Sequence, residues 1–386
     1  MLKRLLSAKI QKYAKQYPIV TVTGPRQSGK TTLCKMLFPE LRYFSLEDLD
    51  VREDARRDPR GFLGEIEKTG AILDEIQRLP ELLSYIQTIA DKNDQPGRFI
   101  LTGSQNFELL NSISQTLAGR TALATLLPFS FDEIYKSRDP GGIDKMLFTG
   151  FYPRIHDKKL NPMEALSFYV STYLERDIRT LIHVKELSKF ELFLKLCAAR
   201  TGQILNMANL ANDCGVNHNT VKSWLSVLET SYIIHFVRPH YKNFRKRLVK
   251  SPKLYFVDVG LAAYLLDIHN PREMSSHPLK GSLFETFVVS DILKFFSNRG
   301  ERKPLCYFRD NVGNEVDLIL DHAGKITPVE IKLSRTVASD FFKGLNYYTK
   351  LNPKNVQKPL LIYGGGESHA RSDTFIVSYR EIAKYL

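Results

Sequence analysis

Apolar runs alternate with helical stretches along the first part of the chain, and each run has the length of a single strand. The runs expected to form strands are residues 18–23, 42–46, 71–73, 98–102 and 122–126. Residues 32–37 have the pattern of a helix following the first strand. Strands separated by helices favour a parallel sheet with helices on both faces. Ligands of such sheets bind beyond the carboxyl ends of the strands, so polar residues there are candidates for a site.

The middle of the chain has the period of helices. Within residues 187–199, Phe190, Phe193, Leu194 and Cys197 are spaced i, i+3, i+4 and i+7. This spacing places them on one helix face, which we expect to pack into the core.

Two short helices around a glycine turn follow. Residues 207–215 read as a helix ending at Gly215, and residues 217–229 as the next helix. This is the helix-turn-helix form, and the second helix opens with asparagine, histidine, threonine and lysine, which can contact bases and phosphates. Residues 231–237 and 254–257 read as strands, which would complete a winged helix.

The charge balance favours a polyanionic partner. The 386 residues include 55 Lys and Arg against 42 Asp and Glu, a formal charge of +13, which indicates nucleic acid first and an anionic membrane surface second. No acidic residue occurs over residues 230–257. The basic residues near the expected wing are Arg238, Lys242, Arg245, Lys246, Arg247, Lys250 and Lys253. Winged helices also serve as protein-binding modules and ATPase lids, but a basic wing favours DNA.

Residues 24–31 match the phosphate-binding loop pattern G-x-x-x-x-G-K-[ST] at every specified position. Backbone N–H groups of such a loop close around phosphate oxygens, and the following helix adds its positive dipole end. Lys30 is expected to reach the β- and γ-phosphates of ATP, and Thr31 to ligate Mg²⁺. A chance glycine-rich turn is the alternative, and the flanking strand and helix weigh against it. The predicted nucleotide-binding residues are Gly24, Pro25, Arg26, Gln27, Ser28, Gly29, Lys30, Thr31 and Thr32.

An acidic pair, Asp74 and Glu75, follows the third predicted strand. ATP hydrolysis requires such groups: Asp74 would hold Mg²⁺, and Glu75 would orient and deprotonate the attacking water. The pair could instead cap the following helix. Downstream of a complete phosphate loop, the catalytic interpretation is the stronger one.

The last third resembles a nuclease. Residues 281–289 begin an amphipathic helix that carries Glu285, and strands are predicted at 305–309, 315–320 and 327–332. Asp317 on one strand, with Glu330 and Lys332 on the next, resembles the PD-(D/E)xK motif. In that motif the carboxylates bind Mg²⁺ and the lysine orients or activates water, and Glu285 could add a metal ligand. The E-x-K triplet is common by chance, and such a fold can survive as a binding module, so cleavage stays uncertain.

Taken together, these features resemble AAA-type ATPases of the additional-strand class, and more narrowly a family of predicted bacterial and archaeal ATPases with a nuclease-like C-terminal domain. The matching stretches are residues 23–32, 73–77, 101–104, 117–120 and 173–177. The resemblance implies that Ser104, with Gln105 beside it, senses the γ-phosphate. It also implies that Arg120 stabilises the transferring charge, within its own chain or from a neighbouring subunit. A surface ion pair is the alternative for Arg120, and Arg154, Arg176 and Arg179 are its competitors.

We therefore predict an α/β protein: an AAA-type parallel sheet with helices on both faces, then a winged helix and a nuclease-like α/β domain. The predicted domains are 1–140 (ATPase), 141–185 (helical linker or lid), 186–260 (winged helix) and 261–386 (nuclease-like). The predicted function is Mg²⁺-dependent ATP binding and hydrolysis coupled to DNA binding, with DNA cleavage as a candidate activity and ATP-dependent self-association as a candidate property.

Two other functions are compatible with parts of the sequence. One is a nucleotide-controlled switch with a protein-binding winged helix and an inert nuclease-like domain. The other, a small-molecule kinase, explains neither the basic wing nor the tail. Four scattered cysteines, no signal-peptide pattern and no apolar run of membrane-spanning length favour the cytoplasm.

Overall fold

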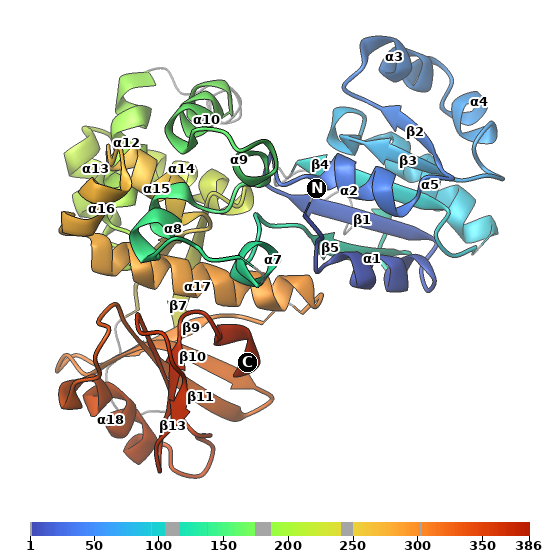
Figure 1. Cartoon of the computed structure of the whole chain (residues 1–386). Helices are drawn as coiled ribbons and strands as arrows, with labels where there is room; N and C mark the ends of the chain where they lie inside the picture. The colour runs from blue at the N-terminus through green and yellow to red at the C-terminus, as the bar shows by residue number, and fades with distance from the viewer. Residues whose placement is uncertain are drawn as a thin grey trace.

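The computed structural model describes residues 2–93, 95–104, 116–136, 138–173, 187–240, 250–301 and 303–386, and its first part is built on a five-stranded sheet (Figure 1). The strands are β1 (Ile19–Gly24), β2 (Arg42–Ser45), β3 (Ala71–Asp74), β4 (Phe99–Ser104) and β5 (Thr121–Thr125). Their order is β2-β3-β4-β1-β5, and every pairing is parallel. The predicted parallel sheet is confirmed.

Helices cover both faces of this sheet because successive strand residues point to opposite sides. The helices are α1 (Ser7–Ala14), α2 (Lys30–Leu37), α3 (Leu49–Arg57), α4 (Pro59–Gly64) and α5 (Leu82–Lys92), with a short 3-10 helix, η1 (Ile76–Arg78). Val20 and Ile72 pack into a core with α1 and α2. Their neighbours Ile19 and Leu73 pack into a second core with α3, α4 and α5.

The middle part consists mainly of helices. They are α7 (Phe131–Tyr135), α8 (Ile143–Thr149), α9 (Pro153–Lys158), α10 (Pro162–Tyr169), α12 (Leu187–Ala199), α13 (Met207–Cys214), α14 (His218–Thr230), α15 (Val259–Leu265), α16 (Pro271–Ser276) and α17 (Lys280–Asn298). The predicted apolar face of α12 is buried, as expected. The Trp224 ring of α14 lies edge-on to Phe190 and Phe193 of α12, with centroids 5.2 and 5.0 Å away.

Three short strands accompany these helices: β6 (Gln203–Ile204), β7 (Ile234–Pro239) and β8 (Lys253–Phe256). β8 pairs antiparallel with both β6 and β7. Of the seven basic residues expected near the wing, four lie outside the described residues: Lys242, Arg245, Lys246 and Arg247. Lys250 is described.

The last part of the chain forms a mixed sheet. Its strands are β9 (Cys306–Arg309), β10 (Glu315–His322), β11 (Lys325–Lys332), β12 (Leu360–Tyr363), β13 (His369–Ala370) and β14 (Phe375–Ser378), with α18 (Lys343–Leu351) and the 3-10 helices η3 (Ser339–Phe342) and η4 (Ile382–Lys384). β9 pairs in parallel with β7, so a nine-stranded sheet runs in the order β13-β14-β12-β11-β10-β9-β7-β8-β6. Continuous pairing therefore bridges the boundary predicted at residues 260 and 261.

Helix α17 joins the three parts of the molecule (Figure 1). Its Asp291 carboxylate accepts a hydrogen bond from the Phe131 backbone N–H at 2.7 Å, and its Ser297 hydroxyl donates to the Thr125 carbonyl at 2.7 Å. It also packs on β8 and β11. Among the described residues, no helix combines the length and hydropathy that a membrane crossing needs.

Candidate functional site

The phosphate loop joins the end of β1 to the start of α2. Gly24 has φ 144°, and a Cβ there would lie 2.1 Å from the Leu126 carbonyl oxygen, so only glycine fits. Gly29 has φ 90°, a left-handed conformation that lets the chain turn into α2. Between them, the Ser28 hydroxyl donates to the Pro25 carbonyl at 2.9 Å. The loop is thus closed by its own backbone and ends at a helix N-terminus.

Lys30 lies inside this loop. Its side-chain ammonium donates to the Gly24 and Pro25 carbonyl oxygens at 3.0 and 2.9 Å, and the residue is only 5% exposed. Burial lowers the pKa of Lys30, while the nearby Glu75 and Asp74 carboxylates oppose the shift. A buried ammonium at the mouth of a phosphate loop is well placed to take phosphate oxygens as its acceptors.

Asp74, at the end of β3, accepts hydrogen bonds from three hydroxyl groups. Thr31 donates to its two carboxylate oxygens at 2.9 and 3.0 Å, and Tyr43 donates at 2.8 Å. Thr102, on the neighbouring strand β4, is the third donor. A threonine hydroxyl beside a buried carboxylate is a donor set that suits Mg²⁺, which takes few protein oxygens and keeps several waters. Thr31 and Asp74 therefore fit the ion that the sequence implies.

Glu75 has a left-handed backbone, with φ 56° and ψ 46°. This conformation is uncommon for a residue with a side chain, and such strain clusters at functional sites. The turn brings Glu75 to the wall of the same cavity as Lys30 and Thr31. Its carboxylate accepts a hydrogen bond from the Gln77 side-chain amide. The predicted base is thus held beside the predicted phosphate and metal ligands.

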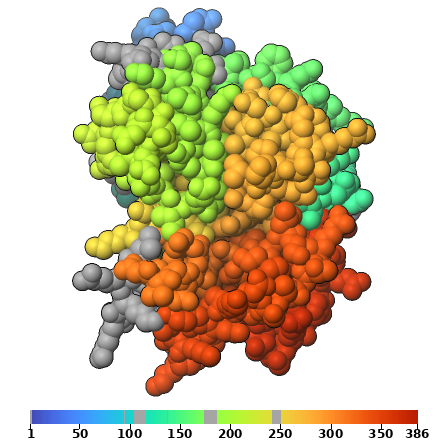
Figure 2. All heavy atoms as spheres, turned by 90° about the vertical axis from the view of Figure 1, so that its left-hand side faces the viewer, coloured from blue at the N-terminus to red at the C-terminus, as the bar shows by residue number. Residues whose placement is uncertain are grey.

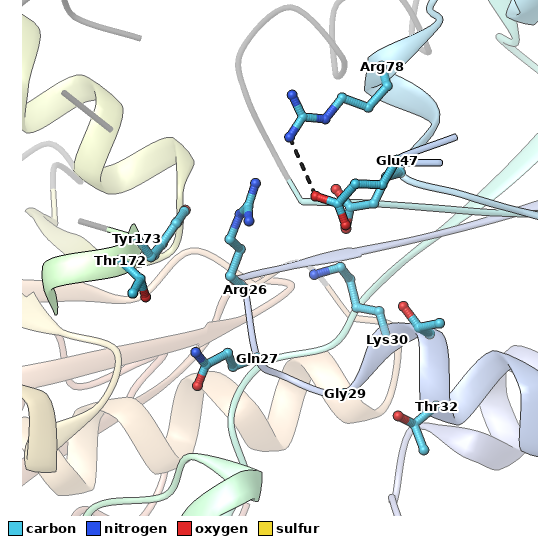
Figure 3. A pocket seen from close by; sticks show the side chains of 11 residues that line it. Arg26, Gln27, Gly29, Lys30, Thr32, Glu47, Arg78, Thr172 and Tyr173 are labelled. Carbon is cyan, nitrogen blue, oxygen red and sulfur yellow. Dashed lines mark ion pairs between the residues drawn. The ribbon is translucent and has the colours of Figure 1, made fainter. Parts of the chain in front are cut away.

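The cavity at this edge of the sheet has a volume of about 490 Å³ (Figure 3). Its lining residues are Arg26, Gln27, Gly29, Lys30, Thr31, Thr32, Glu47, Glu75, Arg78, Thr172 and Tyr173. Glu47, Arg78, Thr172 and Tyr173 had no predicted role at this site. Tyr173 does begin one of the stretches that carried the resemblance, and the Arg26 guanidinium lies 5.3 Å from its ring centroid.

A second, more apolar cavity of about 370 Å³ adjoins the first, because Gln27 and Thr172 line both. Tyr152, Tyr169 and Arg154 contribute to its wall. Arg154, one of the competing arginines, therefore lies next to the phosphate cavity but does not line it. Gln105, Arg176 and Arg179 lie outside the described residues.

The structure separates the two residues that the resemblance placed near the γ-phosphate. Ser104 ends β4 and pairs with Gly24, so its backbone lies beside the start of the phosphate loop. Arg120 precedes β5 at the opposite end of the sheet, where Ile19 begins β1. Its guanidinium donates two hydrogen bonds to the Asp91 carboxylate, one from Nε and one from Nη2, the latter at 3.0 Å. The role of Arg120 within its own chain does not fit this geometry, and only a role toward a neighbouring subunit stays a prediction.

The four residues of the nuclease-like motif are brought together. Lys332 lies 2.6 Å from Glu330 and 3.8 Å from Asp317, and Lys253 lies 3.2 Å from Glu285 and 3.6 Å from Asp317. Burial raises the pKa of Glu285 to about 7, an effect that Lys253 opposes. Burial, reinforced by Asp317, raises the pKa of Glu330 to about 8.

The metal predicted for this second site does not fit the side chains as they stand. Within the described ranges, no group of three or more His, Cys, Asp or Glu side chains is arranged to hold an ion. Lys253, predicted to belong to the basic wing, is 3% exposed and lies among the carboxylates. Its neighbour Glu315, 2.5 Å away, was also missed.

Comparison with known proteins divides the chain into three matched regions. Residues 16–135 match the family model described as an AAA domain. Residues 141–272 and 280–382 match two domains of unknown function, DUF8612 and DUF4143. The chain is also 27% identical over 380 residues to the uncharacterized proteins Mb2031c of Mycobacterium bovis and Rv2008c of Mycobacterium tuberculosis, covering 97% of this chain and 82% of each relative.

Solved structures that align with parts of the chain include the following three. The Walker-type ATPase PABY2304 of Pyrococcus abyssi aligns with a TM-score of 0.44 and 14% identity, over 67% of this chain and 94% of its own. AMPPCP-bound DnaA from Aquifex aeolicus aligns with a TM-score of 0.32 and 14% identity, over 58% and 86%. Thermotoga maritima RuvB aligns with a TM-score of 0.30 and 17% identity, over 60% and 88%.

The class of protein follows from the matched AAA domain and the geometry of its loop. The chain contains an AAA-type P-loop ATPase domain, with the phosphate loop at the carboxyl edge of the five-stranded sheet. The protein is an ATPase, as the sequence predicted.

Proposed function

We propose that this ATPase depends on Mg²⁺ and couples its nucleotide cycle to DNA binding by residues 187–257. The observation that carries the first half is the Thr31–Asp74 contact beside Lys30 and Glu75. These side chains come from two segments, the start of α2 and the end of β3, and Lys30, Thr31 and Glu75 line one cavity. That convergence is what hydrolysis, as distinct from nucleotide storage, requires.

The side chains divide the work of hydrolysis. Lys30 and the loop N–H groups hold the β- and γ-phosphates, and Thr31 and Asp74 hold the metal. Mg²⁺, when bound there, neutralises charge on the phosphate oxygens. Glu75 orients the attacking water and accepts its proton. Ser104, whose backbone pairs with Gly24, is the proposed sensor of the γ-phosphate.

Support for the second half comes from the order of elements after α10. A helix, a strand, two helices and two strands follow one another, and β6, β8 and β7 make one small antiparallel sheet. This order supports the proposal of a winged helix in which α14 serves as the recognition helix.

The polar residues at the start of α14 fall into two groups. The Asn217 side chain accepts hydrogen bonds from Thr220, so this residue caps the helix. His218, Asn219 and Lys222 are exposed, whereas Trp224 on the other face is buried. Figure 2 looks toward the face on which residues of α12–α14, in yellow-green, lie at the surface. A helix with one buried and one exposed polar face can enter a groove of DNA.

The nucleotide cavity and α14 are linked through packed elements. Thr172 and Tyr173, directly after α10, form part of the cavity wall. Helix α10 packs on α15, α15 packs on α12, and the Trp224 ring of α14 lies against α12. A nucleotide that shifts Tyr173 can therefore bias the orientation of the whole helical part.

The test of this proposal is ATP turnover with and without duplex DNA, together with sizing in the presence of ATP. Lys30→Ala and Glu75→Gln should abolish turnover, and absence of Mg²⁺-dependent nucleotide binding would refute the first half. His218→Ala/Lys222→Ala should weaken DNA binding and remove stimulation of turnover. Lys325→Ala, an exposed lysine on β11, is the matched control.

Two outcomes would redirect the proposal. Slow turnover that DNA does not change would favour a nucleotide-controlled switch whose winged helix binds a protein. Self-association with ATP, lost in Arg120→Ala, would support a role of Arg120 toward the neighbouring subunit.

A further inference from the structure

The ammonium of Lys253 occupies the centre of the nuclease-like carboxylate cluster. It lies 2.5 Å from Glu315, 3.2 Å from Glu285 and 3.6 Å from Asp317, and its side chain is 4% exposed. Lys253 belongs to β8, Glu285 to α17, and the other two residues to β10. The single ammonium of Lys253, on β8, thus contacts carboxylates of two other elements, α17 and β10.

Asp317 and Glu315 have donors on their second oxygens, and Glu285 has a second donor on the oxygen that faces Lys253. Asp317 accepts the Ile331 backbone N–H at 2.8 Å, and Glu285 accepts the Tyr255 hydroxyl at 2.5 Å. Glu315 accepts from Arg309 at 3.0 Å. A divalent ion bound by the oxygens that carry these donors would compete with them, and the Lys253 ammonium at contact distance would repel it.

We propose that Lys253 is the resident cation of this cluster and excludes a divalent metal from it. In this state the C-terminal domain is not a metal-dependent nuclease. The cluster instead links β8 to α17 and β10, next to the β7–β9 pairing within the nine-stranded sheet. A buried lysine shared by several carboxylates satisfies both signs of charge at once, which is the condition for keeping them buried.

The test is a Mn²⁺ titration in the presence of a non-hydrolysable ATP analogue. The wild type should bind one Mn²⁺ per chain, at the nucleotide, and Lys253→Ala should bind a second that Asp317→Asn removes. Lys253→Arg, which keeps the charge, should bind one. Failure of Lys253→Ala to gain a site would overturn the role of the lysine.

The wild type alone also decides the matter if a variant does not fold. A second Mn²⁺ in the wild type, or DNA nicking that Asp317→Asn abolishes, would refute the proposal. Binding of no Mn²⁺ at all would count against the nucleotide site and leave the exclusion of metal from the cluster upheld.

A separate observation concerns the nucleotide cavity, and the inference from it rests on the proposed function. Arg78, at the end of η1, lines the cavity together with Glu47, and the two side chains are 3.6 Å apart. Figure 3 shows Arg26, Lys30 and Arg78 directed toward the space near Glu47. Two of the arginines predicted to act on the γ-phosphate are described, Arg120 and Arg154, and neither lines this cavity.

We infer that Arg78 is the arginine that binds the γ-phosphate within its own chain and that Glu47 holds it aside in the nucleotide-free state. The side chains of Arg78 and Glu47 are 44% and 57% exposed, so their ion pair is weak and exchangeable. A triphosphate is a stronger partner because it offers several charged oxygens. The backbone N–H of Arg78 donates to the Glu75 carbonyl at 2.9 Å, which ties its position to that of the predicted base.

Arg78→Ala should lower kcat by about 1000-fold or more while changing ADP affinity little, as expected of a charge-stabilising arginine. Glu47→Gln should tighten ATP binding relative to ADP. Arg42→Ala is the control, since Arg42 forms an exposed pair with Glu65 at the far edge of the sheet. Turnover of Arg78→Ala within threefold of the wild type would refute the inference. Absence of turnover in the wild type itself would refute the proposed function instead.

Discussion

Arg4 connects the N-terminal segment to the phosphate loop, and replacing it with methionine should destabilise the protein severely. Its guanidinium donates to Glu133 at 3.1 Å and to the Ser28 carbonyl at 3.0 Å, and lies 4.5 Å from the Phe129 ring centroid. The side chains of Arg4 and Glu133 are 3% and 0% exposed. This ion pair is therefore fully removed from water.

The magnitude follows from what Arg4→Met leaves behind. Glu133 keeps the backbone N–H groups of Leu5 and Ser130, at 2.7 and 2.8 Å, but loses its only cationic partner among the contacts described above. Breaking one side of a buried ion pair costs about 3–5 kcal/mol. Glu133→Gln should cost less, about 1.5–3 kcal/mol, because Arg4 keeps the carbonyls of Ser28 and Leu127. The double variant should be more stable than the sum predicts, by about 1–3 kcal/mol.

The assay is urea unfolding followed by far-UV circular dichroism, repeated with a bound ATP analogue. Arg42→Met is the control, because the Arg42–Glu65 pair is exposed at 3.8 Å and should change stability by less than about 0.5 kcal/mol. A loss below about 1 kcal/mol for Arg4→Met, or additive effects in the double variant, would refute the reasoning.

Three further predictions concern other sites. Trp224→Ala should cost about 3–5 kcal/mol of unfolding free energy by opening a cavity in the helical core, and a loss under about 1 kcal/mol would contradict that packing. Burial, with a smaller contribution from Arg238, lowers the pKa of His235 from 6.5 to about 4, so its contribution to stability is complete above pH 6.5 and is lost as the pH falls through 4. Between pH 6.5 and pH 4, His235→Gln should therefore lose about 3 kcal/mol less unfolding free energy than the wild type. If the unfolding free energies of the two proteins ran parallel against pH, the titration of His235 would be excluded as the cause. Asp74→Asn should reduce Mg²⁺-dependent turnover on the order of 100-fold, and unchanged Mg²⁺ dependence in a turnover assay would show that the metal is held elsewhere.

The phosphate loop and the parallel sheet could be predicted because their signals are local. A strand, a glycine pattern and a helix within a short stretch define the backbone of the loop, and Lys30 follows from its position in that pattern. Asp74 and Glu75 could be predicted because the carboxyl ends of parallel strands meet at one edge. Tyr43 and Thr102 could not, since a hydroxyl at a strand end is common and its contact with Asp74 depends on strand order.

Arg120 was placed near the phosphates by resemblance, and strand direction decided otherwise. It precedes β5, whereas the phosphate loop follows β1, and in a parallel sheet these are opposite ends. Arg78 and Glu47 carried no recognisable signal because single charged residues in loops usually face solvent. Only the folding of two segments over one cavity sets them beside Lys30.

The chain by itself determined that ATP is bound, since contiguous residues build the loop and its following helix. The tertiary structure decided what the other charges do. Thr31 meets Asp74 across 43 residues of sequence, and Lys253 meets Glu285 across 32. In the sequence, Lys253 is one lysine in a basic stretch. In the fold it is buried among carboxylates, because antiparallel pairing of β7 and β8 carries it beneath α17 and away from water.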